Sequence, residues 1–328
     1  MSSVEKNTVV GIGSALVDLL LSETDDFLEK VHASKGGMEL VDADKIEEIV
    51  GLSTATPDLV PGGSACNTII GIGRLGGKAR FVGKRGDDQL GKRLEMALTD
   101  NEVHPDLLLS DSPTGRVLSI ITPDAQRSMF TYLGASAEST PEEIRAVDLS
   151  DAAIVHIEGY LLFNPELIKA ALETAKAAGA RISLDLASYT VVEASREILN
   201  DIVDNYVDIL IANEDEAQAF TGESDEDKAL TALAERADIA VLKVGPRGSF
   251  IAHDGERHKI GILGDGGARD TTGAGDLWAS GFLHGLVSGL PLDKCGELGA
   301  ACGYEVCQVI GAHIPADGWE RVRKACAK

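Results

Sequence analysis

Short runs of apolar residues, many of them β-branched, alternate along the chain with longer segments in which apolar positions recur every three or four residues. The short runs predict strands, and in chain order these are 8–12, 80–82, 154–157, 181–186, 207–212, 239–244 and 249–253. Helical segments lie between most of them, among them 166–178, 191–200 and 226–235. This alternation predicts an α/β fold with a doubly wound, mostly parallel sheet that carries helices on both faces.

Two stretches, at about 19–41 and 107–133, break this alternation because they contain short strands with turns between them. A small sheet inserted between the helices and strands of an α/β fold predicts a lid over a site. The sequence has no internal repeat, low-complexity tract or Pro/Ser-rich linker. We therefore expect residues 1–328 to form a single domain into which this β lid is inserted.

The charge balance narrows the range of partners. The 328 residues include 30 Lys and Arg against 53 Asp and Glu, a formal net charge of −23 at pH 7, and the basic residues are scattered singly. This balance argues against nucleic acid and anionic membranes as partners. The sequence has no apolar stretch of membrane-spanning length and no signal-peptide pattern at its start, and its five cysteines form no CxxC pair. We expect a cytoplasmic protein in a reducing compartment.

Two glycine motifs look like nucleotide-binding signatures but stand in the wrong context. Gly71, Gly73 and Gly76 fit the GxGxxG dinucleotide pattern, which requires a strand before it and a helix after it. Here a helical segment precedes the motif and a strand follows it, so the glycines favour the end of a close-packed helix. An NAD-dependent dehydrogenase remains only as the alternative function from a different enzyme class. The segment 86–93 is one residue short of a phosphate-binding P-loop and predicts a tight turn into a helix.

A third glycine motif fits its context. Residues 270–276 read Asp-Thr-Thr-Gly-Ala-Gly-Asp and precede an apolar segment of helical period. The small residues Gly273, Ala274 and Gly275 would leave the N–H groups of a helix N-terminus open to an anion. Asp276 would then lie beside the anion and accept a proton from an incoming hydroxyl group. The alternative is that Asp276 only complements the helix dipole.

A further glycine turn also runs into a helical segment. Residues 61–67 read Pro-Gly-Gly-Ser-Ala-Cys-Asn, and the Asn67 side chain can both donate and accept hydrogen bonds toward a polyhydroxyl ligand. Together, the segments 270–276 and 61–67 resemble the two signatures of the ribokinase/PfkB carbohydrate-kinase family. The strand–helix order agrees with that family from about residue 9 to residue 311.

Two more segments are similar to motifs of this family and stand in the family's order. Asn213-Glu-Asp-Glu216 resembles its Asn-x-x-Glu element, and Lys243-Val-Gly245-Pro-Arg-Gly248 resembles its phosphate-side glycine turn. The i,i+3 spacing of Asn213 and Glu216 puts both on one helix face. The alternative for this pair is a helix cap followed by a solvated acid.

The resemblance implies a ribokinase-like fold and an ATP-dependent kinase whose general base is Asp276, with Gly273, Ala274 and Gly275 as the anion hole for the transferring phosphate. The implied substrate-binding residues are Asp18, Gly62, Gly63 and Asn67. The implied ATP-binding residues are Asn213, Lys243, Gly245 and Gly248. Glu216 is implied for Mg²⁺ through water, and Asp270 and Thr272 for a monovalent cation, K⁺.

The resemblance looks strongest to the adenosine-kinase-like branch and implies a primary hydroxyl of a ribose-bearing nucleoside, or of a furanose sugar, as the acceptor. The alternative is a sugar kinase of the ribokinase, fructokinase or ketodeoxygluconate type. This sequence has Asp185 where many relatives have Asn, and this difference leaves the choice between nucleoside and sugar open. The side chains available to pack on a purine are Met38, Tyr132, Tyr160 and Phe163. An exposed lid sheet would also allow a homodimer.

Overall fold

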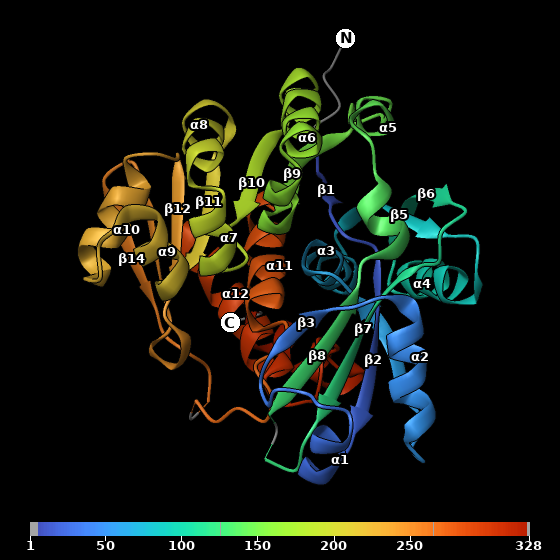
Figure 1. The fold of residues 1–328 in the computed structure, drawn as a ribbon. Helices are drawn as coiled ribbons and strands as arrows, with labels where there is room; N and C mark the ends of the chain where they lie inside the picture. The colour runs from blue at the N-terminus through green and yellow to red at the C-terminus, as the bar shows by residue number, and fades with distance from the viewer. Residues whose placement is uncertain (1–5, 125, 265, 327–328) are drawn as a thin grey trace.

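The computed structural model describes residues 6–124, 126–264 and 266–326 (Figure 1). In these residues nine strands form the larger sheet, in the order β14-β13-β12-β11-β10-β9-β1-β5-β6. Their bounds are β1 (Thr8–Ile12), β5 (Lys78–Gly86), β6 (Val103–Ser110), β9 (Ala152–Glu158), β10 (Arg181–Asp185), β11 (Ile209–Asn213), β12 (Ile239–Lys243), β13 (Ser249–His253) and β14 (Glu256–Ile260). Neighbouring strands from β12 to β6 are parallel, and β13 and β14 join antiparallel.

Helices cover both faces of this sheet, as the sequence predicts (Figure 1). One face carries α5 (Pro141–Arg145), α6 (Pro165–Ala177), α7 (Tyr189–Ala194), α8 (Arg196–Tyr206), α9 (Glu214–Thr221) and α10 (Glu226–Ala234). The other carries α3 (Ser64–Arg74), α4 (Gln89–Asp100) and α11 (Ala274–Val287), with α12 (Leu292–Val306) against α11 and α13 (Ala316–Cys326) against α12. The expected helix at 191–200 is divided at Ser195 into α7 and α8.

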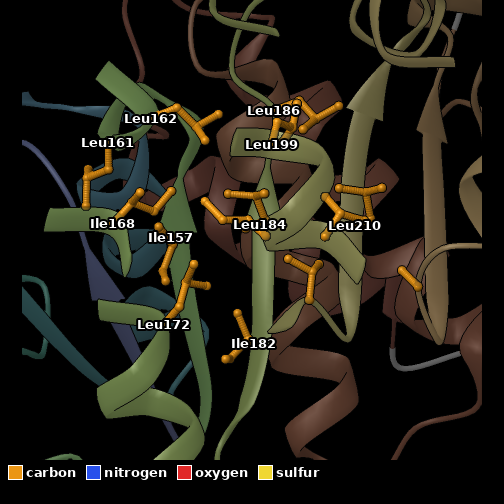
Figure 2. Close-up of a cluster of buried hydrophobic side chains, with 14 of the residues drawn as sticks. Ile157, Leu161, Leu162, Ile168, Leu172, Ile182, Leu184, Leu186, Leu199 and Leu210 are labelled. Atoms are coloured by element: carbon orange, nitrogen blue, oxygen red, sulfur yellow. The ribbon is translucent and has the colours of Figure 1, made fainter. Parts of the chain in front are cut away.

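Strands near the middle of the sheet, such as β11 and β12, send alternate side chains into two separate cores. On β11, Leu210 and Ala212 join the core under α6 to α10, whereas Ile209 and Ile211 join the core under α3 and α11. Figure 2 shows Leu210 in the first of these cores. A strand buried on both sides has a continuous apolar sequence, which is why the short apolar run at 207–212 was enough to predict this strand.

A second, smaller sheet lies beside the carboxyl ends of the parallel strands and has the order β3-β8-β7-β2-β4 (Figure 1). Its strands are β2 (Leu16–Ser22), β3 (Met38–Leu40), β4 (Asp58–Gly62), β7 (Gly115–Ile121) and β8 (Arg127–Tyr132). The helices α1 (Asp25–Lys30) and α2 (Ala43–Leu52) pack on one of its faces through a shared apolar core. We call this sheet the lid.

The lid differs at its boundaries from the expected segments 19–41 and 107–133. Residues up to Ser110 belong to β6 of the larger sheet, so the second segment begins at β7. The edge strand β4 lies outside both expected segments. β4 contains Pro61, and proline lowers the expectation of a strand because it has no N–H group for the hydrogen-bond ladder. At the edge of a sheet, where β4 lies, proline is tolerated.

The GxGxxG segment at 71–76 and the segment 86–93, which resemble nucleotide-binding motifs but lack the required flanking elements, have structural roles. A Cβ atom on Gly71 would collide with the Ser280 hydroxyl of α11, and one on Gly73 would collide with the Asn101 carbonyl. Gly71 therefore allows close packing of α3 against α11, and Gly73 allows close approach of the Asn101 backbone at the end of α4. At 86–93, Asp88 caps α4 by accepting a hydrogen bond from the Gly91 N–H at 2.8 Å, which confirms a turn into a helix.

Three short 3₁₀ helices connect these elements: η1 (Gly134–Glu138), η2 (Gly159–Phe163) and η3 (Gly245–Arg247). Across the described residues, no helix combines the length and the apolar character that a membrane crossing requires. The cysteines Cys66, Cys295 and Cys302 are buried, and Cys307 is half-buried at the end of α12.

Candidate active site

Asp276 lies in the first turn of α11, where donors from α3 reach its carboxylate. Ser64 Oγ donates to Oδ1 at 2.8 Å, and Asn67 Nδ2 donates to Oδ2 at 3.0 Å. Thr68 Oγ1 donates to the backbone carbonyl of Asp276 at 3.1 Å. The glycine segments 61–67 and 270–276 are therefore brought together at one carboxylate.

The environment of Asp276 changes its ionisation. Burial, together with the charge of Asp185, raises the pKa of this carboxyl from its ordinary value near 3.8 to a net value of about 6. The hydrogen bonds from Asn67 and Ser64 and the charge of Lys243 lower it. A carboxylate in this range is a stronger base than an exposed one and is still ionised near neutral pH.

The turn before Asp276 takes the conformation that the motif requires. Gly273 has φ 72° and is the N-cap residue of α11, a left-handed conformation that favours glycine. The Ala274 N–H donates to the Thr271 carbonyl at 3.1 Å and so closes the turn. The next N–H groups of α11, beginning at Gly275, have no acceptor within the helix. The anion hole would therefore rest on Gly275 more than on Ala274.

Lys243, the last residue of β12, lies directly below this turn. A Cβ atom on Gly275 would be 2.9 Å from Lys243 Nζ. The same ammonium donates to Asp185 Oδ2 at 2.8 Å, and both side chains are nearly buried. Burial alone would lower the pKa of Lys243, but the carboxylates of Asp185 and Glu216 raise it. The lysine therefore stays charged.

Asn213 and Glu216 form a capping box at the start of α9. Asn213 Oδ1 accepts from the Glu216 N–H at 2.9 Å, while Glu216 accepts from the backbone N–H of Asn213 at 2.8 Å and from its amide at 2.7 Å. The cap is present, but the acid is buried rather than solvated. Burial, with the charge of Asp185, raises the pKa of Glu216 to about 7.

A pocket of about 530 Å³ opens beside these residues, between the ends of β11 and β12 and the helices α11 and α12. Its lining includes all four residues expected to bind ATP, namely Asn213, Lys243, Gly245 and Gly248. Gly248 has φ 96°, and a Cβ atom there would collide with the Ile260 carbonyl. Gly275 and Trp278 of α11 and Tyr304 of α12 complete the wall near the turn.

Asp18 lies on β2 of the lid, close enough to Asp276 for the charge of Asp276 to act on it. A Cβ atom on Gly62 would collide with the Asp18 carboxylate, and one on Gly63, which has φ 98°, would collide with the Ser14 carbonyl. Burial raises the pKa of Asp18 to about 7; Arg127 lowers it and Asp276 raises it. The structure thus gathers Asp18, Gly62, Gly63 and Asn67 around Asp276.

The turn at Asp270 is held by its own hydrogen bonds. Asp270 Oδ1 accepts from the N–H and the hydroxyl of Thr272, at 3.0 and 2.7 Å, and Oδ2 accepts from the Gly311 N–H at 2.8 Å. Arg127 of the lid lies 3.8 Å from the same carboxylate and donates to Ser119 Oγ at 2.8 Å. These donors satisfy Asp270 without a cation, so the structure gives no support for a K⁺ site here.

The sequence reasoning missed the role of Glu158, the last residue of β9. Its carboxylate accepts from the Ser14 N–H at 2.8 Å and from the Ala65 N–H at 3.0 Å, and so joins the two segments that connect β1 and α3 to the lid. The available signal was its position after a buried parallel strand, the edge at which α/β folds bind ligands. Ser64 was also missed, although it directly follows the two glycines.

Comparison with known proteins agrees with this arrangement. Residues 37–318 match the pfkB family carbohydrate kinases. The chain is 30% identical to the ribokinase of Arabidopsis thaliana over 280 residues, which cover 81% of the chain and 71% of that protein. It is 29% identical over 272 residues to the 5-dehydro-2-deoxygluconokinase of Geobacillus thermodenitrificans, and these residues cover 78% of the chain and 80% of that protein.

Two solved structures resemble nearly the whole chain. A probable sugar kinase of Rhizobium etli is 33% identical with a TM-score of 0.89, and the adenosine kinase of Sinorhizobium meliloti is 34% identical with a TM-score of 0.87. In both cases 98% of this chain and 99% of the other are covered. The chain therefore belongs to the pfkB family of carbohydrate kinases and is a sugar or nucleoside kinase, a phosphotransferase that acts on an alcohol group.

Proposed function

We propose that this kinase transfers the γ-phosphate of ATP to the primary hydroxyl of a ribose-bearing nucleoside of the adenosine type, with Asp276 as the general base. The observation that carries the proposal is the position of Asp276. The preceding residue, Gly275, lines the nucleotide-sized pocket, and the charge of Asp276 acts on Asp18, whose lid face also carries apolar side chains.

The base role follows from the hydrogen bonds of Asp276. Ser64 and Asn67 each hold one carboxylate oxygen, so the group is fixed in orientation while a lone pair on each oxygen stays available. A pKa of about 6 leaves it deprotonated at neutral pH and able to accept the proton of an attacking hydroxyl. No covalent nucleophile is needed, because phosphoryl transfer depends mainly on positioning and on charge stabilisation.

The phosphate side combines backbone and side-chain donors. The N–H groups at the start of α11 and the Lys243 ammonium converge on one place beside Gly275. Both favour an anion even in a strongly acidic protein, because they act at contact distance while the net charge is screened over about 8–10 Å. Gly245 and Gly248, on the other wall of the pocket, leave room for the rest of the nucleotide.

Magnesium fits this site as a partner of the nucleotide. No group of three or more His, Cys, Asp or Glu side chains among the described residues is arranged to hold a metal ion. Mg²⁺ is commonly held by one or two carboxylates together with phosphate oxygens and water. Glu216 would supply such a carboxylate through water, and when bound the ion would neutralise charge on the phosphates.

The lid face toward Asp18 favours a nucleoside. The register of the lid strands puts Leu20, Val117, Met129 and Met38 on the same face as Asp18, while α1 and α2 cover the other face. Asp18 and Asn67 suit ribose hydroxyl groups, and the apolar side chains suit a purine ring. Tyr132, expected as a possible purine contact, alternates with Thr131 and packs with the lid core instead.

A sugar acceptor is the second candidate, because the sequence relatives include a ribokinase and 5-dehydro-2-deoxygluconokinases. A gluconate derivative carries a carboxylate and would need a cation. Arg127 lies on this lid face, where it donates to Ser119 and lies 3.8 Å from Asp270, while its buried Nε has no hydrogen-bond partner among the described residues. Arg127 is therefore the cation that could receive such a carboxylate.

The test is the rate of ADP formation with adenosine, inosine, ribose, fructose and 5-dehydro-2-deoxygluconate, each at several concentrations with ATP and Mg²⁺. We expect the highest kcat/KM with adenosine. A higher kcat/KM with one of the sugars would replace the nucleoside proposal by the sugar alternative. Turnover with none of the five would overturn this assignment of the acceptor.

A further inference from the structure

Asp185 accepts a hydrogen bond on each of its carboxylate oxygens, and one of the two donors is a nearly buried ammonium group. Oδ1 accepts from the Ala187 N–H at 3.0 Å, and Oδ2 accepts from the Lys243 ammonium at 2.8 Å. Ala187 has φ 66°, so the backbone turn after β10 is fixed against this carboxylate. The side chain therefore has one orientation.

Lys243 has donors left for a ligand. An ammonium group has three N–H donors, and Asp185 takes one of them. The ammonium also lies under the α11 turn, at 2.9 Å from the position of a Cβ on Gly275, and lines the nucleotide-sized pocket. A phosphate oxygen bound by the first N–H groups of α11 would come within reach of the same ammonium.

We propose that Asp185 is a positioning residue for phosphate binding: its ion pair with Lys243 holds the ammonium under the N-terminus of α11, where it binds the nucleotide phosphates. This inference rests on the proposed use of the pocket by ATP. It concerns a residue that touches neither the nucleotide nor the acceptor and acts through Lys243.

An asparagine at position 185 cannot replace this function. Its amide has a single carbonyl oxygen, which can accept from Ala187 or from Lys243 but not from both in this geometry. The amide nitrogen would then face a second donor, and the lysine would lose its countercharge. Because the lysine side chain has four flexible methylene groups, the ammonium would no longer be held under Gly275.

The pair also acts on Asp276 through its charges. The titratable and charged groups that face Asp276 from the surrounding elements are Asp18, Cys66, Glu158, Tyr160, Asp185 and Lys243. Asp185 raises the pKa of Asp276 and Lys243 lowers it. Removing the charge of Asp185 alone leaves the lysine unopposed, so the pKa of Asp276 falls and the acid limb of the activity profile moves to lower pH.

The first experiment measures binding of a non-hydrolysable ATP analogue with Mg²⁺ by calorimetry, without acceptor. We expect Asp185→Asn to raise the dissociation constant of the analogue about tenfold, the size of effect that the loss of one charge-assisted hydrogen bond has. We also expect the acid limb of kcat/KM to move down by about half a pH unit, with the KM for the acceptor unchanged. Asp106→Asn is the matched control, because it breaks the Arg80–Asp106 ion pair of β5 and β6 outside the site.

A second comparison shows whether Asp185 acts through the lysine. In a Lys243→Met background, Asp185→Asn should cause no further loss of analogue binding, whereas an additional tenfold loss would contradict the proposal. This pair of variants also decides the question if Asp185→Asn alone does not fold, because the double variant removes both charges of the Asp185–Lys243 ion pair together.

The outcomes separate this inference from the proposed function. If the wild-type protein binds the analogue and Asp185→Asn binds it equally well with an unchanged acid limb, the positioning role is wrong and the kinase assignment stands. If the wild-type protein does not bind the analogue, the proposed ATP site is wrong, and the role of Asp185 falls with it.

Discussion

The side chain of Asn67 donates a hydrogen bond of 3.0 Å to the carboxylate of Asp276, although the two residues are 209 positions apart in the chain. This contact joins the N-terminal turns of α3 and α11. It brings the segment that faces the lid to the segment that faces the nucleotide pocket. The consequences of this contact for ionisation, stability and catalysis can each be measured.

Ser64→Ala should move the acid limb of kcat/KM to higher pH. Ser64 donates to the ionised form of Asp276 and so lowers its pKa; without this bond the carboxyl takes up a proton at a higher pH. The measurement is the pH dependence of kcat/KM between pH 5 and pH 8, a window set by the pKa of about 6. Thr68→Ala is the control, because Thr68 bonds only the backbone of Asp276. A shift to lower pH in Ser64→Ala would contradict the account.

Asp276→Asn should stabilise the fold at pH 8. The pKa of Asp276 rises from 3.8 to about 6 on folding, so the folded protein favours the protonated carboxyl. Stability is therefore lost as the pH rises from about 4 to about 6. The neutral amide removes this penalty, and we expect the free energy of unfolding in urea to rise by about 1–2 kcal/mol at pH 8 and to change little near pH 4. A variant that is less stable than wild type at pH 8 would refute this prediction.

Gly62→Ala should weaken binding of the acceptor and leave ATP binding unchanged. A Cβ atom at this position would collide with the Asp18 carboxylate and displace it. We expect the KM for the acceptor to rise about tenfold or more, because displacement of a positioning group by about 1 Å can cost as much as a hundredfold in rate. Gly51→Ala is the control, since a Cβ atom there has open space. An equal rise in the KM for ATP would show that the substitution disturbs the whole site.

Glu216→Gln should raise the Mg²⁺ concentration needed for half-maximal activity. The amide can still accept the hydrogen bond from the Asn213 N–H, so α9 keeps most of its cap, but the negative charge for the metal is lost. Glu143→Gln is the matched control, because Thr140 and Glu143 form the same capping box on α5. If magnesium titrations of Glu216→Gln match those of wild type, Glu216 does not serve the metal.

The sequence alone was sufficient to predict those features of the fold and of the site that residues adjacent in the chain determine. Hydrophobic periodicity located most strands of the larger sheet, and the glycine turns at 61–67 and 270–276 were recognisable because each depends on a few adjacent residues. The ion pair of Asp185 and Lys243 joins residues 58 positions apart, and the Glu158 bond to Ser14 spans 144 positions. Such contacts depend on strand order, which periodicity does not determine.

The lid was the least predictable part for a related reason. Two of its strands, β3 and β4, have three and five residues and are mostly exposed, so their apolar pattern is weak, and β4 contains a proline. The hydrogen bonding of Ala274 was also not predictable from the sequence. Its N–H group closes the turn before α11, and only the observed geometry shows that the next residue offers the open donor.

The central claim is that Asp276 accepts the proton of the acceptor hydroxyl during phosphoryl transfer, and the most direct measurement compares Asp276→Asn with wild type at saturating ATP, Mg²⁺ and adenosine at pH 8. The account predicts that the variant folds and binds the ATP analogue with a dissociation constant near that of wild type, while kcat falls by about 10²–10⁴-fold. A variant that keeps a kcat within a few-fold of wild type would contradict the claim and leave Asp276 as a structural residue that joins α3 to α11.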